Sequence, residues 1–113
     1  MYLVRVSKGF SAAHAVKGTG GKCEEIHGHN YLVEVVVGGK ELNQPGMVVD
    51  FVQLRSKLGE ILPDHRLLNE VYNFNPTAEN LARHFYEEMA KFYPVVKVRV
   101  WENEDCWAEY QPD

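Results

Sequence analysis

The segment from His27 to Val37 limits the possible folds more than any other part of this sequence. Its side chains alternate, so that one face of an extended strand, at a period of two, carries His27, His29, Tyr31, Val33, Val35 and Val37. A second alternating segment begins at Tyr2, and a loop with three glycines between Lys17 and Lys22 separates the two. The pattern predicts two strands that can pair antiparallel across this loop.

Two helices are predicted between these strands and the C-terminus. Asp50 has the properties of an N-cap for the first helix, which ends at Pro63. Asn75 is the expected cap of the second helix, and Pro76 suits its first turn. The inward-facing side chains of this second helix, which stops at Pro94, are predicted to be Leu81, Phe85, Met89 and Phe92.

Two further strands, predicted over residues 95–102 and 106–110, complete the order strand, strand, helix, helix, strand, strand. This order predicts an α+β fold with an antiparallel four-stranded sheet and two helices on one of its faces. A chain of 113 residues that is 45% hydrophobic has the size of one domain, so residues 1–113 are expected to form a single domain around one core.

The composition argues against several classes of partner. The net charge is -4 and there is no long basic run, which argues against binding to nucleic acid. No apolar run reaches the roughly 20 residues that span a bilayer, and the N-terminus lacks a signal-peptide pattern, so we expect a cytoplasmic protein without a membrane partner. Cys23 and Cys106 are too few for a disulfide framework, and Cys106 is expected to pack beside Trp107.

His27-Gly28-His29 is the strongest local indication of chemistry. Imidazoles at positions i and i+2 of a strand project from one face with Cα atoms about 6.6 to 6.8 Å apart, which lets both reach one metal ion. His14 lies beyond the first predicted strand, where antiparallel pairing can bring it alongside. Three histidines with an open fourth position are typical of catalytic zinc, whereas the pair taken alone is more often an ordinary half-exposed pair of side chains.

Cys23 lies four residues before His27 and next to Lys22. A metal dication and a neighbouring cationic side chain both lower the pKa of a thiol, so Cys23 is a candidate base. Two alternatives remain open for this residue. Cys23 is the fourth ligand of a structural zinc site, or it is an inert thiol in the loop.

Four ionisable side chains in the second half of the sequence need an interpretation. Asp64 and His65 follow the first helix and have the components of a proton relay, although a polar pair at a helix exit is normally a turn. Glu102 shares its predicted face with the valines at positions 96, 98 and 100, so its carboxylate either has a partner there or has reached the sheet edge and points to water. His84 is expected on the solvated side of the second helix.

Taken together, these residues resemble the 6-pyruvoyl-tetrahydropterin synthase family, including its branch of 6-carboxy-tetrahydropterin synthases. The resemblance covers nearly the whole chain. Its short motifs, in the order of the family, are Phe10-Ser11-Ala12-Ala13-His14, Cys23 with His27-Gly28-His29-Asn30-Tyr31, Gly46-Met47-Val48-Val49-Asp50-Phe51, Asp64-His65 with Leu68-Asn69, Asn75-Pro76-Thr77 with Glu79-Asn80, and Glu102. So many motifs in one order are jointly specific.

The resemblance implies a tunnelling fold, in which three subunits close a barrel and two trimers stack into a homohexamer with active sites between subunits. The resemblance implies that His14, His27 and His29 are the zinc ligands. It implies that Cys23 is the base and that Asp64 and His65 form the proton relay. The implied substrate contacts are Glu102 and Thr77. The implied reaction converts 7,8-dihydroneopterin triphosphate to 6-carboxy-5,6,7,8-tetrahydropterin, with loss of triphosphate and acetaldehyde, in queuosine biosynthesis.

Other activities remain open. The product of the wider family, 6-pyruvoyl-tetrahydropterin, is one. Glu24 directly follows Cys23, and some family members use a glutamate at that place to make 6-hydroxymethyl-dihydropterin for folate, so the chain is alternatively bifunctional, with Glu24 as a second catalytic residue. Glu24 and Glu25 are otherwise a solvated acidic pair. An alternative of another class is a non-catalytic domain whose histidines and Cys23 close a structural zinc site.

Overall fold

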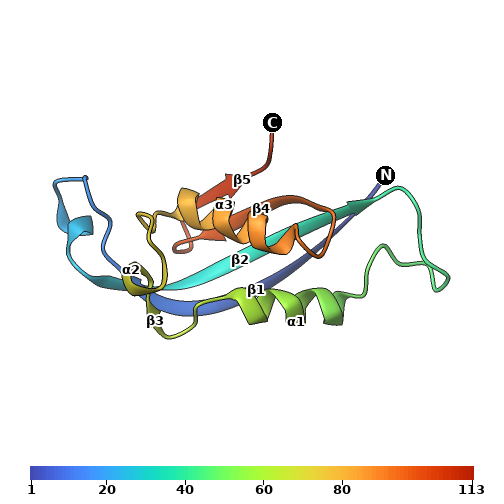
Figure 1. Cartoon of the computed structure of the whole chain (residues 1–113), viewed down its shortest axis with the longest axis horizontal. Helices are drawn as coiled ribbons and strands as arrows, with labels where there is room; N and C mark the ends of the chain where they lie inside the picture. The colour runs from blue at the N-terminus through green and yellow to red at the C-terminus, as the bar shows by residue number, and fades with distance from the viewer.

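The two long strands pair along their entire length. In the structure, a computed structural model that describes residues 1–113, β1 (Tyr2–His14) and β2 (His27–Gly39) form an antiparallel hairpin that runs until His14 lies opposite His27 (Figure 1). Side chains directly opposite each other share a face, so this register carries the alternation of β2 across to β1. β1 is longer than predicted, and His14 is its last residue rather than a residue beyond it.

Three more strands extend this hairpin to a five-stranded sheet. β4 (Val95–Trp101) pairs antiparallel with β2, and β5 (Trp107–Tyr110) pairs antiparallel with β4. At the other edge, β3 (Arg66–Leu67) pairs parallel with β1, so the order is β3-β1-β2-β4-β5. The predicted four-stranded antiparallel sheet is therefore wrong by one strand, because a segment of two residues is too short to show any hydrophobic alternation.

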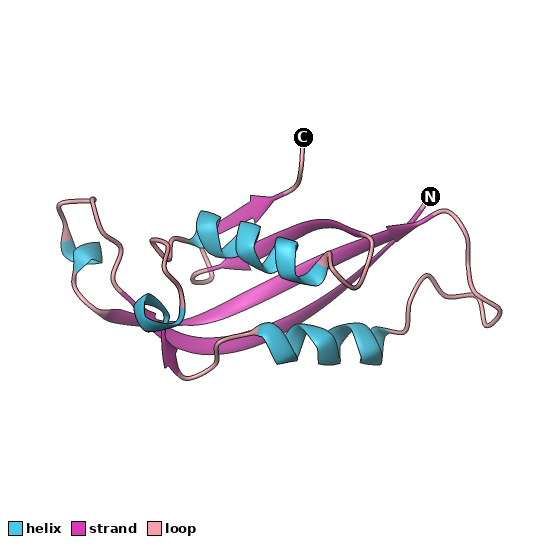
Figure 2. Cartoon of the chain, in the orientation of Figure 1, coloured by secondary structure: helices cyan, strands magenta, loops and turns pink.

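Two helices cover one face of the sheet, as predicted. α1 (Phe51–Ile61) packs against β1, and α3 (Ala78–Met89) packs against β4 and β5 (Figure 2). Two shorter helices go beyond the prediction: the 3-10 helix η1 (Lys22–Glu24), in the connection between β1 and β2, and α2 (Leu68–Val71), one turn directly after β3. None of the helices has the length and apolar character needed to cross a bilayer.

Side-chain caps set the starts of both long helices. Asp50 Oδ1 accepts a hydrogen bond of 2.7 Å from a backbone N–H in the first turn, which confirms the predicted N-cap of α1. The cap of α3 is Thr77 and not Asn75, because Thr77 Oγ1 accepts the N–H of Asn80 at 3.1 Å. The side chain of Asn75 pairs instead with the backbone of Lys17.

One continuous hydrophobic core lies between the helices and the sheet. Its fully buried members include Val33, Val35, Val37, Leu54, Leu58, Leu81, Phe85, Met89, Val98 and Val100. Phe92, predicted to face inward, is 56% exposed and lies beneath the ammonium group of Lys57, 4.0 Å away. α3 ends at Met89, so Phe92 no longer follows the helical period on which its prediction depends.

A β-bulge changes which valine enters the core at the start of β4. Simple alternation places Val96 inward. In the structure, the register between β2 and β4 shifts between Val36 and Val37, so Val95 is buried and Val96 is only half-buried. The bulge leaves the alternation after it intact, and Glu102 keeps its predicted face.

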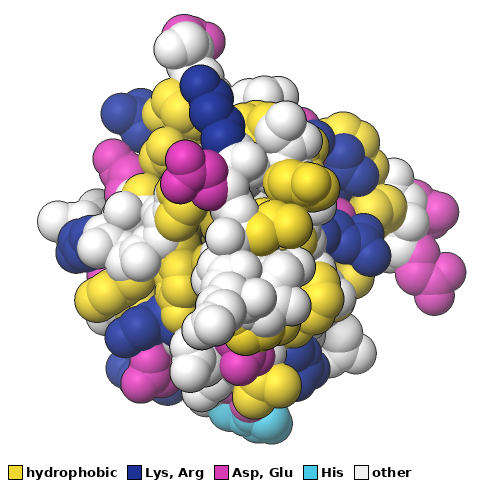
Figure 3. Space-filling model, turned by 90° about the vertical axis from the view of Figure 1, so that its right-hand side faces the viewer, with side chains coloured by type: hydrophobic (Ala, Val, Ile, Leu, Met, Phe, Trp, Pro, Cys, Tyr) yellow, Lys and Arg dark blue, Asp and Glu magenta, His cyan; other side chains and the backbone are white.

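Large hydrophobic side chains are exposed at the end of the molecule that holds the N-terminus and residues 40–49. Figure 3 views this end and shows hydrophobic side chains between charged ones. A hollow of about 220 Å³ there has an almost entirely apolar lining. Its most exposed members are Tyr2, Leu3, Leu42, Met47 and Phe51. Exposed apolar side chains that gather at one place are typical of a contact surface.

Phe85 and Phe92 provide a matched test of this core. Phe85 is fully buried, with its ring 6.0 Å from that of Phe10 in an edge-to-face arrangement. Phe85→Ala is expected to lower the free energy of unfolding by about 3 to 5 kcal/mol, because it removes buried apolar area and leaves a cavity. Phe92→Ala removes the same atoms from an exposed ring and should cost less than about 1 kcal/mol. Urea denaturation measures both free energies of unfolding. Equal losses in the two variants would contradict the placement of Phe85 in the core and of Phe92 at the surface.

Candidate metal centre

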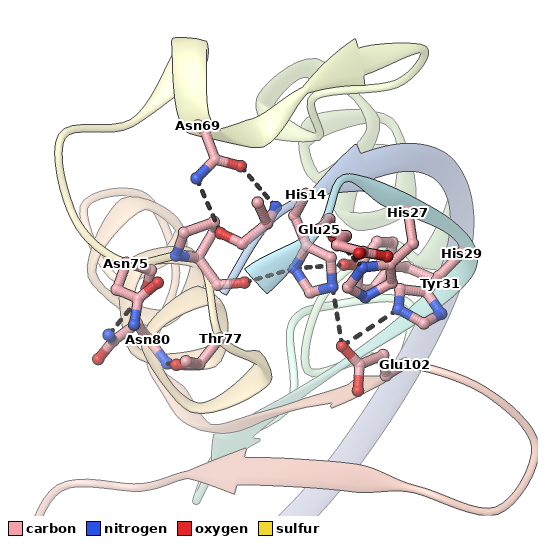
Figure 4. Close-up of polar contacts among 12 residues, drawn as sticks. His14, Glu25, His27, His29, Tyr31, Asn69, Asn75, Thr77, Asn80 and Glu102 are labelled. Atoms are coloured by element: carbon pink, nitrogen blue, oxygen red, sulfur yellow. Dashed lines mark hydrogen bonds and ion pairs between the residues drawn. The ribbon is translucent and has the colours of Figure 1, made fainter. Parts of the chain in front are cut away.

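Three imidazoles meet at the end of the β1–β2 hairpin. His14 lies directly opposite His27, and Ala12 lies opposite His29, so the register places all three rings on the core face. The ring centroid of His14 is 4.6 Å from that of His27 and 5.0 Å from that of His29, and the last two are 4.9 Å apart. Figure 4 shows the three rings grouped beside Glu102. The three histidines predicted as metal ligands are thus brought together.

Backbone carbonyls hold two of the rings by their Nδ1 atoms. His14 Nδ1 lies 2.8 Å from the carbonyl oxygen of Pro76, and His27 Nδ1 lies 2.7 Å from that of Glu25. Because a carbonyl oxygen only accepts hydrogen bonds, each Nδ1 carries the proton and donates it. The lone pair of both rings is therefore on Nε2, the atom that remains to bind a metal ion.

Two buried nitrogen atoms of the cluster make no hydrogen bond, although the carboxylate of Glu102 lies close to both. These atoms are Nε2 of His14 and Nε2 of His29. A buried polar atom without a partner costs roughly 1 to 3 kcal/mol, so such atoms are rare in folded proteins. Burial also lowers the pKa of His29; Glu102 opposes this effect, and His14 and His27 add to it, so the ring is neutral at pH 7. Neutral imidazole is the form that binds Zn²⁺, and this set of nitrogens fits such an ion.

The carboxylate of Glu102 lies beside the imidazole cluster. Its Oε1 is 3.1 Å from His14 Nε2 and 3.3 Å from His29 Nε2. One ligand atom from each of the three histidines and from Glu102 lies within 4.8 Å of the others. Burial and then the charge of Glu102 raise the pKa of the Tyr31 hydroxyl above its usual range. The structure therefore places this carboxylate on the inward face, beside the imidazoles, in place of the alternative in which it points to water.

Cys23 is exposed on η1, outside the group of four ligand atoms. Two backbone contacts connect its loop to the histidines. The carbonyl of Cys23 accepts the N–H of Val16, two residues after His14, at 2.7 Å, and the carbonyl of Glu25 holds His27. The structure places Cys23 on the loop that joins the two strands at the cluster, and not among the four grouped ligand residues.

The side chain of Glu24 closes the glycine-rich loop. Its Oε1 accepts hydrogen bonds of 3.1 Å from the backbone N–H groups of both Gly18 and Gly20. These two glycines have φ angles of 89° and 71°, a conformation that glycine adopts without strain. The carboxylate of Glu24, predicted from the sequence as a candidate second catalytic group, is therefore hydrogen-bonded to backbone amides of its own loop.

Asp64 and His65 contact each other at the edge of the hairpin. Asp64 Oδ2 is 2.9 Å from His65 Nδ1, and Asp64 Oδ1 accepts the N–H of Ser11 at 2.9 Å. The hydrogen bond from Ser11, followed by that from His65, holds the pKa of Asp64 below its usual value. His65 has a φ angle of 58°, in the left-handed region, where the chain turns into β3. Its ring is 82% exposed and lines a hollow of about 500 Å³.

This hollow and the imidazole cluster use opposite faces of the same strands. Most of its strand lining, namely Ser11, Ala13, Gly28 and Asn30, alternates along β1 and β2 with the residues of the cluster, and Ala12 and His29 also border the hollow. Within one chain, the predicted proton relay and the predicted metal ligands are therefore not brought together.

Two backbone carbonyls at the cluster escape sequence reasoning. Pro76 orients His14 and Glu25 orients His27, but a carbonyl is common to every residue type and leaves no signal in the sequence. Thr77, a predicted substrate contact, lies beside Pro76, where its hydroxyl caps α3. The Asn75-Pro76-Thr77 motif is thus a structural support of the cluster.

Two predictions for residues outside the cluster are wrong. His84 is half-buried, with its ring 4.7 Å from that of Tyr72 and 5.4 Å from that of Phe74, and is not a solvated side chain. Cys106 is exposed and does not pack into the sheet. His84 is covered by the neighbouring segment of Tyr72 and Phe74, whereas Cys106 lies just before β5 and not within it.

Comparisons with known proteins find relatives over almost the whole chain. The family model described as 6-pyruvoyl tetrahydropterin synthase matches residues 3–113. A protein of Archaeoglobus fulgidus, provisionally named as a 6-carboxy-5,6,7,8-tetrahydropterin synthase, is 44% identical over 110 residues, which cover 95% of this chain and 93% of that one. A protein of Pyrococcus furiosus named dihydroneopterin monophosphate aldolase is 36% identical over 108 residues, which cover 90% of each chain.

The fold is shared with a solved structure. The structure of Caenorhabditis elegans 6-pyruvoyl tetrahydropterin synthase superposes with a TM-score of 0.87 at 27% identity, covering 99% of this chain and 96% of that one. This likeness confirms that the single chain has the fold of the family that the sequence motifs imply. The matched family model, the close relatives and the shared fold agree, and the chain belongs to the 6-pyruvoyl tetrahydropterin synthase family.

Proposed function

We propose that this chain is a zinc-dependent lyase that converts 7,8-dihydroneopterin triphosphate to 6-carboxy-5,6,7,8-tetrahydropterin, with loss of triphosphate and acetaldehyde. The observation that carries the proposal is the pair of buried Nε2 atoms without hydrogen-bond partners, on His14 and His29. The family and the name of the Archaeoglobus fulgidus relative support the substrate class and the product. In this proposal the product serves queuosine biosynthesis in the cytoplasm.

The imidazole cluster and Glu102 have separate roles in this proposal. His14, His27 and His29 hold the zinc ion through their Nε2 atoms. A bound zinc ion supplies Lewis-acid stabilisation of charge on the side-chain oxygens of the substrate. Glu102 anchors the pterin ring, because a carboxylate accepts two parallel N–H bonds from the amino and amide groups of the ring. Its side chain is only 28% exposed, which favours a hydrogen-bonded partner over water.

Cys23 is the proposed base. Its thiolate accepts a proton from the substrate side chain. Asp64 orients His65 through their 2.9 Å contact, and this pair then carries the proton onward. Each step uses side chains that the loop and the hairpin edge already hold.

A homo-oligomer accounts for the separation of the relay from the cluster. His65 and the imidazole rings lie on opposite faces of the hairpin, so one chain does not assemble the whole set. An active site between subunits, as in a homohexamer of two stacked trimers, brings the relay of one subunit to the cluster of another. The exposed apolar end around Met47 and Phe51 and the unpaired edge of β5 are surfaces for such contacts.

A second reaction has its own support. The Pyrococcus furiosus relative is named an aldolase, and Glu24 beside Cys23 makes cleavage to 6-hydroxymethyl-dihydropterin the alternative, alone or in a bifunctional enzyme. The two hydrogen bonds that Glu24 Oε1 accepts from loop amides favour a structural use of this carboxylate instead. The name of the matched family adds 6-pyruvoyl-tetrahydropterin as a third product to test.

Product analysis decides between these reactions. Zinc-loaded protein incubated with dihydroneopterin triphosphate is expected to release 6-carboxy-tetrahydropterin, triphosphate and acetaldehyde, measured by mass spectrometry of the pterins and by trapping of the aldehyde. Glu24→Gln keeps an oxygen for the two loop amides and removes any base, and should leave the rate within about twofold. A dominant 6-pyruvoyl or 6-hydroxymethyl product would assign the chain to another branch of the family. So would a main product that the Glu24→Gln variant no longer forms.

Cys23→Ala separates the catalytic reading from a structural zinc site. It is expected to lower turnover by at least about 100-fold, because the base is lost, while the zinc content stays at the wild-type level. The zinc content is measured by plasma mass spectrometry. His27→Ala, which removes a proposed ligand, is expected to lose the bound zinc. Cys106→Ala removes the other exposed thiol and should change neither quantity. Loss of zinc from Cys23→Ala would favour a non-catalytic domain with a structural zinc site.

Glu102→Gln tests the proposed pterin anchor. The variant is expected to weaken pterin binding by roughly tenfold or more, since it replaces charge-assisted hydrogen bonds, with the zinc content unchanged. Calorimetric titration of the zinc-loaded protein measures the affinity, and the exposed Glu104→Gln is the matched control. Unaltered affinity would count against the anchor, and a loss of zinc would make Glu102 a metal ligand.

A further inference from the structure

Two asparagine side chains hold the residues that flank Val16. Asn69, in α2, pairs with Ala15 through both ends of its amide: Oδ1 accepts the N–H of Ala15 at 2.8 Å, and Nδ2 donates to its carbonyl at 2.9 Å. Asn75 pairs with Lys17 in the same way, and both distances are 2.9 Å. Each amide takes the place of a neighbouring strand beside a segment that has already left the sheet.

Val16, between these two clamped residues, is connected directly to Cys23. The N–H of Val16 donates to the carbonyl of Cys23 at 2.7 Å. The loop between them contains three glycines, which have more conformational freedom than any other residue type. The hydrogen bonds that Glu24 accepts from Gly18 and Gly20 close this loop on itself, and the contact at Val16 connects it to the rest of the chain. The place of Cys23 relative to the cluster therefore depends on Val16, which Asn69 and Asn75 hold from both sides.

Asn75 belongs to a segment that also orients a candidate metal ligand. Its carbonyl accepts hydrogen bonds from Asn80 Nδ2 at 2.9 Å and from the N–H of Thr77 at 2.8 Å, at the start of α3. The next residue, Pro76, accepts the Nδ1 proton of His14 (Figure 4). The segment of Asn75 and Pro76 thus positions the imidazole of His14. Through Val16, it also positions the loop that carries Cys23.

We propose that Asn69 and Asn75 are positioning residues, which hold Cys23 in register with the metal cluster through Val16. The inference rests on the proposed function of Cys23 as a base. Proton transfer requires donor and acceptor to be within hydrogen-bond reach, so a loosened loop lowers the rate of the chemical step more than it lowers substrate binding. Neither asparagine needs to touch the substrate for this role.

Amide hydrogen exchange of Val16, measured by NMR on the zinc-loaded protein, tests the clamp without any substrate. Asn69→Ala or Asn75→Ala removes both hydrogen bonds of one clamp, and should accelerate exchange of the Val16 N–H by roughly tenfold or more. Asn73→Ala is the matched control, because Asn73 is an exposed residue of the same segment and takes no part in either clamp.

Kinetics test the connection to Cys23. In either alanine variant, kcat is expected to fall about 10- to 100-fold, with KM within about twofold and the zinc content unchanged. The same substitutions made in a Cys23→Ala background should cause little further loss, since the group they position is already absent. A merely structural role predicts instead that thermal stability, zinc content and kcat fall together in both backgrounds.

Each outcome decides a different part of the proposal. Unchanged exchange of Val16 in the folded variants overturns the clamp, and faster exchange with unchanged kcat overturns its connection to Cys23. If wild-type protein does not turn over the pterin, the proposed function fails, whereas the exchange data still decide the clamp. Asn69→Asp and Asn75→Asp replace alanine variants that do not fold, because aspartate keeps the acceptor, and they should accelerate exchange by a smaller factor.

Discussion

The candidate site depends on the register of a single antiparallel hairpin. β1 and β2 have 13 residues each, and they pair until His14 faces His27. A slip of one residue would turn one strand's histidines to the opposite face of the sheet. It would also expose the valines of β2 that are now fully buried, at about 1.5 to 3 kcal/mol for each side chain. Hydrophobic packing along the hairpin therefore fixes the geometry of the imidazoles at its end.

The cluster itself is an unfavourable arrangement that the surrounding structure maintains. Two carbonyls direct the protons of His14 and His27 away from the centre, and two Nε2 atoms are buried without hydrogen bonds. In the absence of a further ligand this arrangement lowers stability, and the adjacent core offsets the loss. A site that collects lone pairs at such a cost is prepared for an electrophile. The carboxylate of Glu102 lies beside these nitrogens and is, in the proposed function, the group that meets the N–H donors of the substrate.

Alternation and capping signals correctly predict the residues whose position depends only on the strand or helix that contains them. The face of β2, the cap at Asp50 and the inward position of Phe85 are of this kind. The predictions fail where contact with a neighbouring strand or helix determines pairing or burial. β3 exists only as an edge beside β1, the bulge at the start of β4 brings Val95 into the core, and the end of α3 leaves Phe92 outside it.

The sequence by itself determined the family of the chain and which residues are candidates for its chemistry, because a period of two places His27 and His29 on one face and the motifs match the family. Only the tertiary structure decided how these residues are held. The carbonyls of Pro76 and Glu25, and the amides of Asn69 and Asn75, act across long separations in sequence or through backbone atoms common to all residues. Such contacts have no periodic signal, since they exist only once the strands and helices have packed together.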